Sequence, residues 1–395
     1  ELIITDTPVF SQFEFTVLIV DEAHRLKNPH SKLLQALLQV TGNFRILLTG
    51  TPLQNTIEEL QSLLEYLHPG MFTDLTTPQT SDDIQKLRAQ IDPLMLRRMK
   101  RDVNIAILPK EETIIECSMT KYQKQFYRAI LESNAGFLTQ NANLINISME
   151  LRKVCIHPFL IKGAEEKILE DFPSPISLDG YYDALIRSSG KMILLDKLLP
   201  KLKADGHRVL IFSQMTNLLD ILHDYLNYKQ YEVRRIDGRV RGDQRQALID
   251  QFNDPANDVF VFLLCTRAGG LGINLNAADT VIIFDSDWNP QNDLQAQARC
   301  HRIGQEKLVK VYRLITKGTY EQKMLEISSK KLGLGHAVLD RGNKKELDRL
   351  LRLGAYYALN DVEDENFDEE HIEDILSRSA TLVAQDLDGS HMSRA

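Results

Sequence analysis

The chain has 395 residues, of which 43% are hydrophobic and 26% charged, and its net charge is −8. This length allows two or three domains, and the composition is typical of a globular protein rather than of a disordered or fibrous one. No apolar run approaches the roughly 18 residues that a membrane-spanning helix needs, so we expect no membrane partner. The four cysteines lie far apart without a C-x-x-C pair, which argues against zinc and disulfides and favours a reducing compartment.

The negative charge is concentrated in one segment. Residues 361–374 contain nine acidic residues and no Lys or Arg, and without them the net charge is +1. A near-neutral body can carry a basic groove, so the overall charge neither supports nor excludes a nucleic-acid partner. Two interpretations of the acidic segment are open: it binds histones or a basic patch, or it is a solvated linker.

The first third of the chain has the pattern of an α/β sheet. Residues 16–20 are apolar and β-branched, which predicts a buried parallel strand. Leucines at helical spacing follow in residues 31–40, and residues 44–50 predict a second strand. Beyond them, residues 56–160 are expected to be mainly helical because apolar residues recur on one face. Two prolines and a glycine predict a loop over residues 172–181.

From Gly190 onward the α/β pattern resumes. Five apolar runs separated mostly by helical segments predict a second, doubly wound domain at about 190–330. The expected strands are residues 208–212, 231–236, 259–264, 280–284 and 309–314.

Two short motifs follow the strands of the first part. Asp21-Glu22-Ala23-His24 ends the first strand, where the Asp of an NTPase holds Mg²⁺ and the next Glu orients the attacking water. The segment 48–55 follows the second strand, and its glycine and small hydroxyl residues permit close backbone approach. Taken alone, the first motif is equally consistent with a solvated acidic turn and the second with an ordinary Gly-Pro turn.

Three more motifs lie in the second part. Residues 265–275 contain three glycines whose amides can approach phosphates, or can simply make a tight strand–helix connection. Arg299 and Arg302 are three residues apart, so we expect them on one helical face, where two guanidinium groups can clamp a triphosphate or form surface salt bridges. Trp288, the only tryptophan, follows a predicted strand, where it is either exposed to stack on a base or partly buried.

Together these motifs resemble the Snf2 family of helicase-like ATPases within superfamily 2. They occur in the family's order over about 290 residues. The resemblance implies two RecA-like lobes with ATP and Mg²⁺ in the cleft between them, movement along duplex DNA, and repositioning of nucleosomes in the nucleus. The matching segments are 21–24, 48–55, 212–214, 236–242, 266–275, 285–293 and 295–305.

Longer strings narrow the resemblance to the chromodomain-helicase-DNA-binding group, and within it to the Kismet-type branch. This group carries chromodomains upstream of the motor, and histones are among its expected partners. In that branch the region after the motor packs back on it. The strings are Leu151–Glu166, Ser188–Pro200 and Lys344–Tyr356, the last followed by the acidic segment.

The resemblance also implies a role for individual residues. Asp21 holds Mg²⁺ through a bound water, Glu22 is the catalytic carboxylate, and Arg299 and Arg302 are arginine fingers. The other expected roles are nucleotide binding for His24, Gly270, Gly272 and Gln295, DNA binding for Thr266, Arg267 and Trp288, and coupling of hydrolysis to lobe movement for Thr49 and Thr51.

The expected architecture is α/β, with a first RecA-like lobe truncated at its amino terminus. No G-x-x-x-x-G-K-[ST] loop precedes Asp21, although the family places one upstream. We therefore expect a fragment of a remodeller, inactive alone. Two alternatives are a non-catalytic DNA- or nucleosome-binding module and a strand-separating helicase, and the strings 270–275 and 285–290 argue against the latter. The expected domains are the first lobe at 1–105, a helical insertion and linker at 106–185, the second lobe at 186–335, and C-terminal helices with the acidic segment at 336–395.

Overall fold

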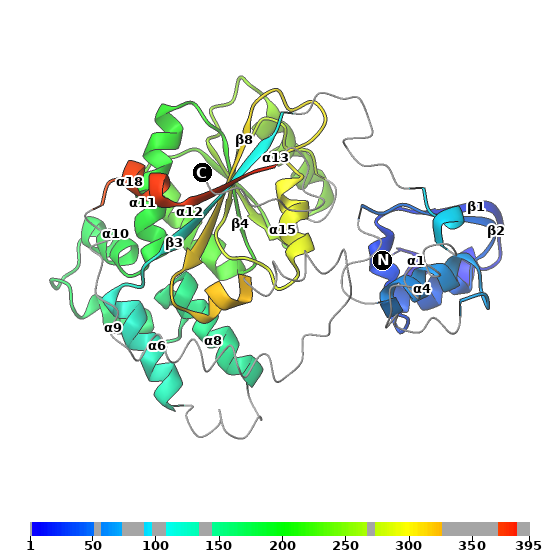
Figure 1. Cartoon of the computed structure of the whole chain (residues 1–395), viewed down its shortest axis with the longest axis horizontal. Helices are drawn as coiled ribbons and strands as arrows, with labels where there is room; N and C mark the ends of the chain where they lie inside the picture. Colours follow the sequence, from blue (N-terminus) through cyan, green and yellow to red (C-terminus); the bar gives the residue numbers. More distant parts are fainter. Residues whose placement is uncertain are drawn as a thin grey trace. The chain divides into compact units, whose positions relative to one another are not determined.

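The computed structural model describes residues 2–50, 57–72, 91–96, 108–133, 144–266, 273–325 and 370–384. These residues form two compact units, one from the described residues up to 96 and one from residue 108 onward (Figure 1). Each unit has its own sheet, and both sheets contain parallel strands connected through helices. The predicted α/β class is therefore confirmed.

The first unit is built on two parallel strands, β1 (Glu14–Val20) and β2 (Thr41–Leu47). The helix α3 (Lys32–Leu38) connects them, and it begins where the Ser31 Oγ accepts a hydrogen bond from the Leu34 amide at 3.2 Å. The predicted strand–helix–strand unit is confirmed, although β2 begins at residue 41 rather than 44. The remaining elements are α1 (Leu2–Thr5), α2 (Thr7–Phe10), η1 (Ala23–Leu26), α4 (Ile57–Leu67) and η2 (Asp92–Leu94).

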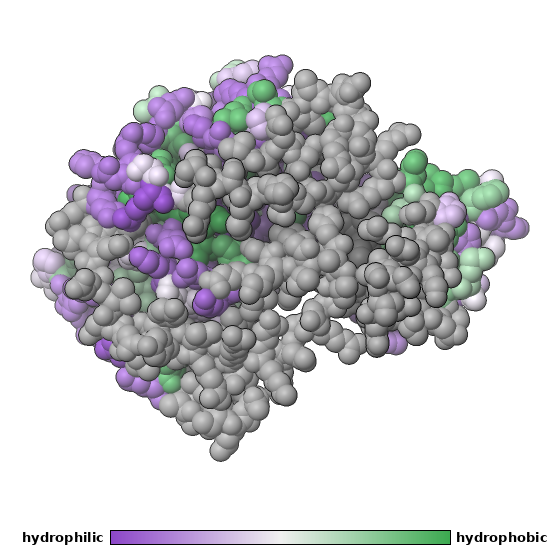
Figure 2. All heavy atoms as spheres, in the orientation of Figure 1, coloured by the Kyte–Doolittle hydropathy of each residue, from purple (hydrophilic) through white to green (hydrophobic). Residues whose placement is uncertain are grey.

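The prediction that the first strand is buried is wrong. Residues of η1, α3 and α4 form one apolar core with Val20 and Leu47 at the strand ends. Along both strands exposed side chains alternate with partly buried ones, and Ile19 and Phe44 are exposed. Hydrophobic side chains therefore lie at the surface of this unit (Figure 2). A two-stranded sheet with its helical core on one side leaves its other face uncovered.

The second unit contains a seven-stranded sheet with the order β5-β6-β4-β7-β8-β3-β9. Its first six members are parallel, and β9 pairs antiparallel with β3. All five strands predicted from apolar runs are confirmed. The strands are β3 (Lys110–Cys117), β4 (Val209–Ser213), β5 (Val233–Ile236), β6 (Val261–Cys265), β7 (Thr280–Ile283), β8 (Val309–Thr316) and β9 (Ala380–Ala384).

The described part of residues 56–160 is mainly helical, as predicted, but it also contains the strand β3, which the sequence did not indicate. This strand pairs with β8 from Lys110 to Cys117, so this segment belongs to the sheet of the second unit rather than to a helical insertion. Its sequence is rich in charged residues and so lacks the apolar run that indicates a buried strand, although the strand is buried along most of its length. The buried Lys110 and Glu112 are compensated by partners far along the chain, described below.

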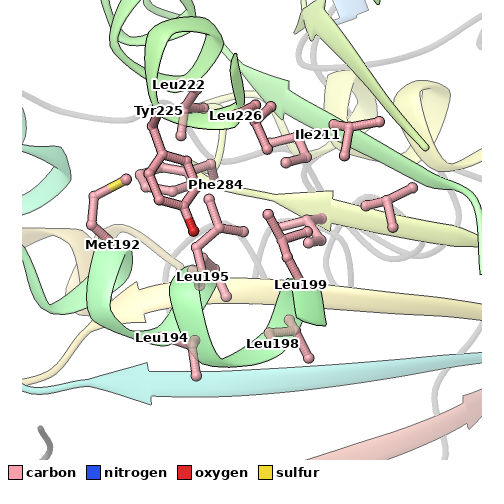
Figure 3. Packing of buried hydrophobic residues seen from close by; sticks show 14 of the residues in the cluster. Met192, Leu194, Leu195, Leu198, Leu199, Ile211, Leu222, Tyr225, Leu226 and Phe284 are labelled. Carbon is pink, nitrogen blue, oxygen red and sulfur yellow. The ribbon is translucent and has the colours of Figure 1, made fainter. Parts of the chain in front are cut away.

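Helices cover both faces of this sheet (Figure 1). Helix α11 (Gly190–Ala204) packs its leucines against α12 (Thr216–Tyr228) and the sheet, with Tyr225 and Phe284 in the same core (Figure 3). A second core lies around α13 (Gly242–Asn253) and α15 (Pro290–Gln297). The other helices are α6 (Lys121–Ser133), α8 (Leu144–Ile156), η4 (Pro158–Leu160), α9 (Ala164–Leu169), α10 (Leu178–Arg187) and α18 (Ile372–Arg378).

Two further features bear on the sequence predictions. The loop predicted over residues 172–181 ends at Ser177, whose Oγ accepts the Gly180 amide at 3.1 Å and starts α10. The four cysteines are buried free thiols. Among the helices that the structure describes, none combines the length and the apolar character required to span a bilayer.

Candidate functional site

The acidic motif lies where β1 ends, beside the segment that follows β2. The Leu48 amide donates to the Val20 carbonyl, and the Ala23 amide donates to the Leu48 carbonyl, each at 2.9 Å. Parallel pairing of the two strands thus brings Asp21 and Glu22 next to Thr49, although about 28 residues separate them in sequence. Thr51 is outside the described residues.

Glu22 adopts an unusual backbone conformation for this residue type. Its φ and ψ are 51° and 46°, in the left-handed region, and its amide donates to the Asp21 Oδ1 at 2.8 Å. Such a conformation costs about 1 kcal/mol or more in a non-glycine residue and is concentrated at functional sites. The His24 Nδ1 lies 3.2 Å from the Glu22 Oε2. Burial lowers the pKa of His24, against the opposing effect of Glu22, so the imidazole is neutral near pH 7.

The donor atoms at this strand end suit Mg²⁺. Asp21 is exposed and offers carboxylate oxygens, the ligand type that Mg²⁺ prefers. Within the described parts of the chain, no group of three or more His, Cys, Asp or Glu side chains is arranged to hold a metal. Mg²⁺ commonly binds through one or two carboxylates together with waters and substrate phosphates, so a single strand-end Asp is compatible with it.

In the second unit, polar residues follow three adjacent strands. Gln214 comes after β4, Thr266 after β6 and Asp285 after β7, so all three lie at the carboxyl edge of the sheet. Thr266 is 6% exposed, and its Oγ1 and the Gln214 Nε2 are buried without a hydrogen-bond partner among the described residues. Buried donors without acceptors are costly, so these two groups stand out from the other polar side chains at this edge. Arg267, Gly270 and Gly272 fall outside the described residues.

Trp288 lies on the loop after β7, as predicted. Its ring packs against Tyr320 with the centroids 5.5 Å apart, and the residue is 39% exposed. The indole of Trp288 therefore packs against the Tyr320 ring, and part of it is accessible to a ligand.

The expected placement of Arg299 and Arg302 on one helical face is wrong. Helix α15 ends at Gln297, two residues before Arg299, and the amides of Cys300 and His301 both turn back to the Gln297 carbonyl at 3.1 and 3.0 Å. Gly304, with φ of 95°, continues the turn in a conformation that favours glycine. Arg299 is buried in this turn and Arg302 is exposed, whereas Gln295 lies in the last turn of the helix and is partly buried.

A buried network of charged side chains engages Gln297, the residue at which this turn begins. The sequence analysis did not predict this network. The Arg313 guanidinium contacts the Glu112 carboxylate at 2.8 Å and the Asp293 carboxylate at 2.5 Å, while Gln297 donates to Glu112 at 3.2 Å. Lys110 donates to the Gln297 side chain. Burial raises the pKa of Asp293 to about 6 despite Arg313. The members are too widely spaced in sequence for a local motif to indicate them.

Two family models match the chain. The first describes an SNF2-related domain and matches residues 1–160, and the second describes a helicase conserved C-terminal domain and matches residues 190–304. These domains and the two α/β units are consistent with the two RecA-like lobes expected from the motifs.

The chain is also similar to individual curated proteins. It is 55% identical to chromodomain-helicase-DNA-binding protein 8 of Danio rerio and to chromodomain-helicase-DNA-binding protein 7 of Gallus gallus, and 54% identical to chromodomain-helicase-DNA-binding protein 9 of Homo sapiens. Each comparison covers 98% of this chain but only 17%, 14% and 14% of the relative. The chain belongs to the Snf2 family, in its chromodomain-helicase-DNA-binding group, and spans less than a fifth of the length of these relatives.

Proposed function

We propose that the longer protein containing this sequence is an ATP-dependent DNA translocase that repositions nucleosomes in the nucleus. It hydrolyses ATP to ADP and phosphate and uses the energy to move along duplex DNA. The observation that carries the proposal is the left-handed Glu22, placed directly after a parallel strand and beside Thr49. Membership of a group of chromodomain-helicase-DNA-binding proteins supports it.

In the proposed reaction each unit supplies different groups. Asp21 holds the Mg²⁺ that neutralises phosphate charge, and Glu22 orients the water that attacks the terminal phosphorus. Arg299 and Arg302 stabilise the negative charge that develops on the transferred phosphoryl group. The remaining nucleotide contacts are assigned to His24, Gln295, Gly270 and Gly272.

The DNA-binding role is assigned to the carboxyl edge of the second sheet. Thr266 and Gln214 carry hydroxyl and amide groups, which are side-chain types that contact DNA phosphates, and the accessible part of Trp288 is suited to a sugar or base. Arg267 is assigned to the same DNA, and Thr49 and Thr51 to the coupling of hydrolysis with lobe movement. Histones of the nucleosome are the proposed protein partners.

A second function is favoured by the grouping of these DNA-binding features. Thr266, Gln214 and Trp288 all lie in the second unit, whereas Asp21 and Glu22 lie in the first. A chain that binds DNA or nucleosomes without using nucleotide is therefore the alternative, and only measurements of hydrolysis distinguish the two.

The test is ATP hydrolysis by the full-length protein, with and without nucleosomal DNA. We expect Glu22→Gln to abolish DNA-stimulated hydrolysis while a fluorescent ATP analogue still binds, because the amide keeps the shape but cannot polarise water. Arg302→Ala should reduce turnover by about a thousandfold or more. Glu14→Gln, an exposed carboxylate on the same strand, and Arg187→Ala, an exposed arginine of α10, are the matched controls and should retain activity.

Normal DNA-stimulated turnover in Glu22→Gln or Arg302→Ala would refute the assignment of the catalytic groups. If the wild-type protein binds DNA tightly but hydrolyses no ATP under any condition, the binding-module alternative is correct. The 395-residue chain, measured in parallel, shows whether this part of the protein turns over by itself.

A further inference from the structure

One buried arginine contacts both loops that carry the proposed DNA-binding groups. Arg152, on α8, is 4% exposed. Its guanidinium donates to the Asp285 Oδ2 at 3.1 Å, to the Ser286 carbonyl at 2.6 Å, and to the Gln214 Oε1 at 3.3 Å. Gln214 follows β4, and Asp285 and Ser286 begin the loop that leads from β7 to Trp288. Arg152 therefore joins two loops that follow neighbouring strands of the sheet.

Within the described residues, the hydrogen bonds of Arg152 all go to these two loops. Two other buried cations reach this loop or the residue just before it: Lys191 donates to the Phe284 carbonyl and Arg313 to the Ser286 Oγ, each at 2.8 Å. Each of those cations also has acidic partners elsewhere in the unit. Arg152 differs from them because its single salt bridge, to Asp285, lies within the loop.

The contact with Gln214 also fixes the direction of its amide. Because the Oε1 accepts from Arg152, the Nε2 lies at the opposite end of the amide group, where it has no partner among the described residues. The Gln214 main-chain amide donates to the Asp285 carboxylate at 3.2 Å, so Asp285 holds the same residue at a second point. Arg152 and Asp285 together fix the position of the Gln214 side chain and the direction of its amide group.

A second connection runs from the same helices to Trp288. Tyr127 of α6 shares an apolar core with Leu151 and Val154 of α8 and with Tyr320. The Tyr127 hydroxyl accepts the Tyr320 amide at 3.2 Å, and the Tyr320 ring packs on Trp288. The helix pair α6 and α8 is thus connected to the Trp288 loop at two points. Arg152 contacts the start of the loop, and Tyr320, which is bound by Tyr127, contacts the indole of Trp288.

Burial of a guanidinium is unfavourable unless its partners compensate, and an apolar side chain would pack α8 against the sheet at lower cost. We propose that Arg152 is a positioning residue, which holds the Gln214 and Trp288 loops in the arrangement that binds DNA without contacting DNA itself. The DNA-binding part of this proposal rests on the proposed function, whereas the positioning of the loop does not.

The single tryptophan of the chain makes the loop directly observable. Intrinsic fluorescence of the 395-residue chain reports on Trp288, and acrylamide quenching reports on its accessibility. We expect Arg152→Met to increase the quenching constant and to weaken binding of a duplex oligonucleotide by about tenfold or more. Lys153→Met, which removes the neighbouring cation of a partly exposed pair with Glu150, is the matched control and should change neither value.

Because Arg152→Met leaves the Asp285 carboxylate buried without its cation, that variant can lose stability for a trivial reason. The double variant Arg152→Met with Asp285→Asn removes both charges, so we expect its melting temperature to return toward wild type while quenching and DNA affinity stay altered. Compared with Arg152→Met, Arg152→Lys should have a stability close to that of the wild type but only part of its DNA affinity. An ammonium group lacks the planar fork of the guanidinium that reaches both loops.

Wild-type quenching in the folded double variant would overturn the positioning role, whatever the DNA affinity. Altered quenching with unchanged DNA affinity would overturn its connection to DNA binding. If quenching changes but the wild-type chain itself fails to bind DNA, the positioning role is supported and the proposed DNA-binding function of this edge fails.

Discussion

At the scale of single residues, the second unit contains ionisable side chains that are buried and paired over long distances in sequence. Lys191 contacts Glu321 at 2.5 Å, and Arg152 contacts Asp285 at 3.1 Å. A buried pair of this kind contributes little net stability compared with apolar residues, but loss of one partner costs about 3–5 kcal/mol. Such pairs are therefore understood better as fixing the position of loops than as stabilising the fold.

His157 is a buried residue whose protonation is linked to folding. Its Nδ1 accepts the Phe159 amide at 3.1 Å, so the Nε2 carries the proton and donates to the Leu185 carbonyl at 3.0 Å. A second proton, on Nδ1, would face the Phe159 N–H. Burial lowers the pKa of His157 from 6.5 to about 4, against the opposing hydrogen bond to Leu185. Between these values the unfolded chain binds a proton that the folded chain does not.

We therefore predict that His157 destabilises the fold as the pH falls from about 6.5 to about 4, by up to about 3 kcal/mol. Urea unfolding followed through Trp288 fluorescence measures this, and the relevant quantity is the difference between wild type and His157→Gln. Asp293 acts in the opposite direction, because burial raises its pKa to about 6 and its proton stabilises the fold at low pH. His223→Gln, which replaces a more exposed histidine, is the comparison variant, and an unchanged pH dependence in His157→Gln contradicts the prediction.

At the scale of elements, the central strands of the second unit could be predicted because each is an apolar run buried on both faces. β3 could not, since the burial of Lys110 and Glu112 depends on Gln297 and Arg313, which lie 187 and 201 residues away. The end of α15 was missed for a related reason: the Gln297 side chain is engaged by this network, and the main chain turns there.

The candidate site likewise contains residues that the sequence indicated and a residue that it did not. The local motifs indicated Asp21, Glu22 and Thr49 correctly as neighbours of strand ends, and the structure brings them together through parallel pairing. The role of Arg152 had no local signal, because it lies within an ordinary amphipathic helix and its partners are 62, 133 and 134 residues away. A side chain that acts through long-range contacts is visible only when the sheet is assembled.

The start of α11 gives a prediction for one element. A Cβ added to Gly190 would lie 2.1 Å from the Ser118 carbonyl oxygen, a backbone atom that cannot rotate away. The Gly190 amide also donates to the Gln123 side chain at 3.0 Å, so a shift of the helix would strain this bond. We predict that Gly190→Ala lowers the free energy of unfolding by about 1–3 kcal/mol or more.

Gly242 provides a matched control, because it is the first residue of α13 as Gly190 is of α11, and a Cβ there meets open space. Gly242→Ala should leave stability unchanged or raise it by up to about 1 kcal/mol, since alanine favours the helix. Urea denaturation of both variants measures the difference. Equal stability of the two would show that the helix can move away from Ser118 at little cost.

At the scale of the whole molecule, residues 370–384 return to the second unit and complete its sheet. β9 pairs with β3 from Lys110 to Ile114, and α18 places Ile375, 1% exposed, in the core beside α11. One ion pair and one hydrogen bond accompany this contact: Lys201 pairs with Glu373, and Lys197 donates to the Glu370 main-chain carbonyl at 2.8 Å. Glu373, at this end of the acidic segment, thus pairs with a lysine of the same unit.

The apolar contact and the ion pair differ in energy. Ile375→Ala removes a buried side chain, which should cost about 2–4 kcal/mol and release the segment for proteolysis. Glu373→Gln removes an exposed charge that water and salt already screen, so it should change the cleavage rate much less. Limited proteolysis with mass spectrometry, at low and high salt, measures both. Wild-type protection that disappears in high salt would show instead that the charges hold this segment in place.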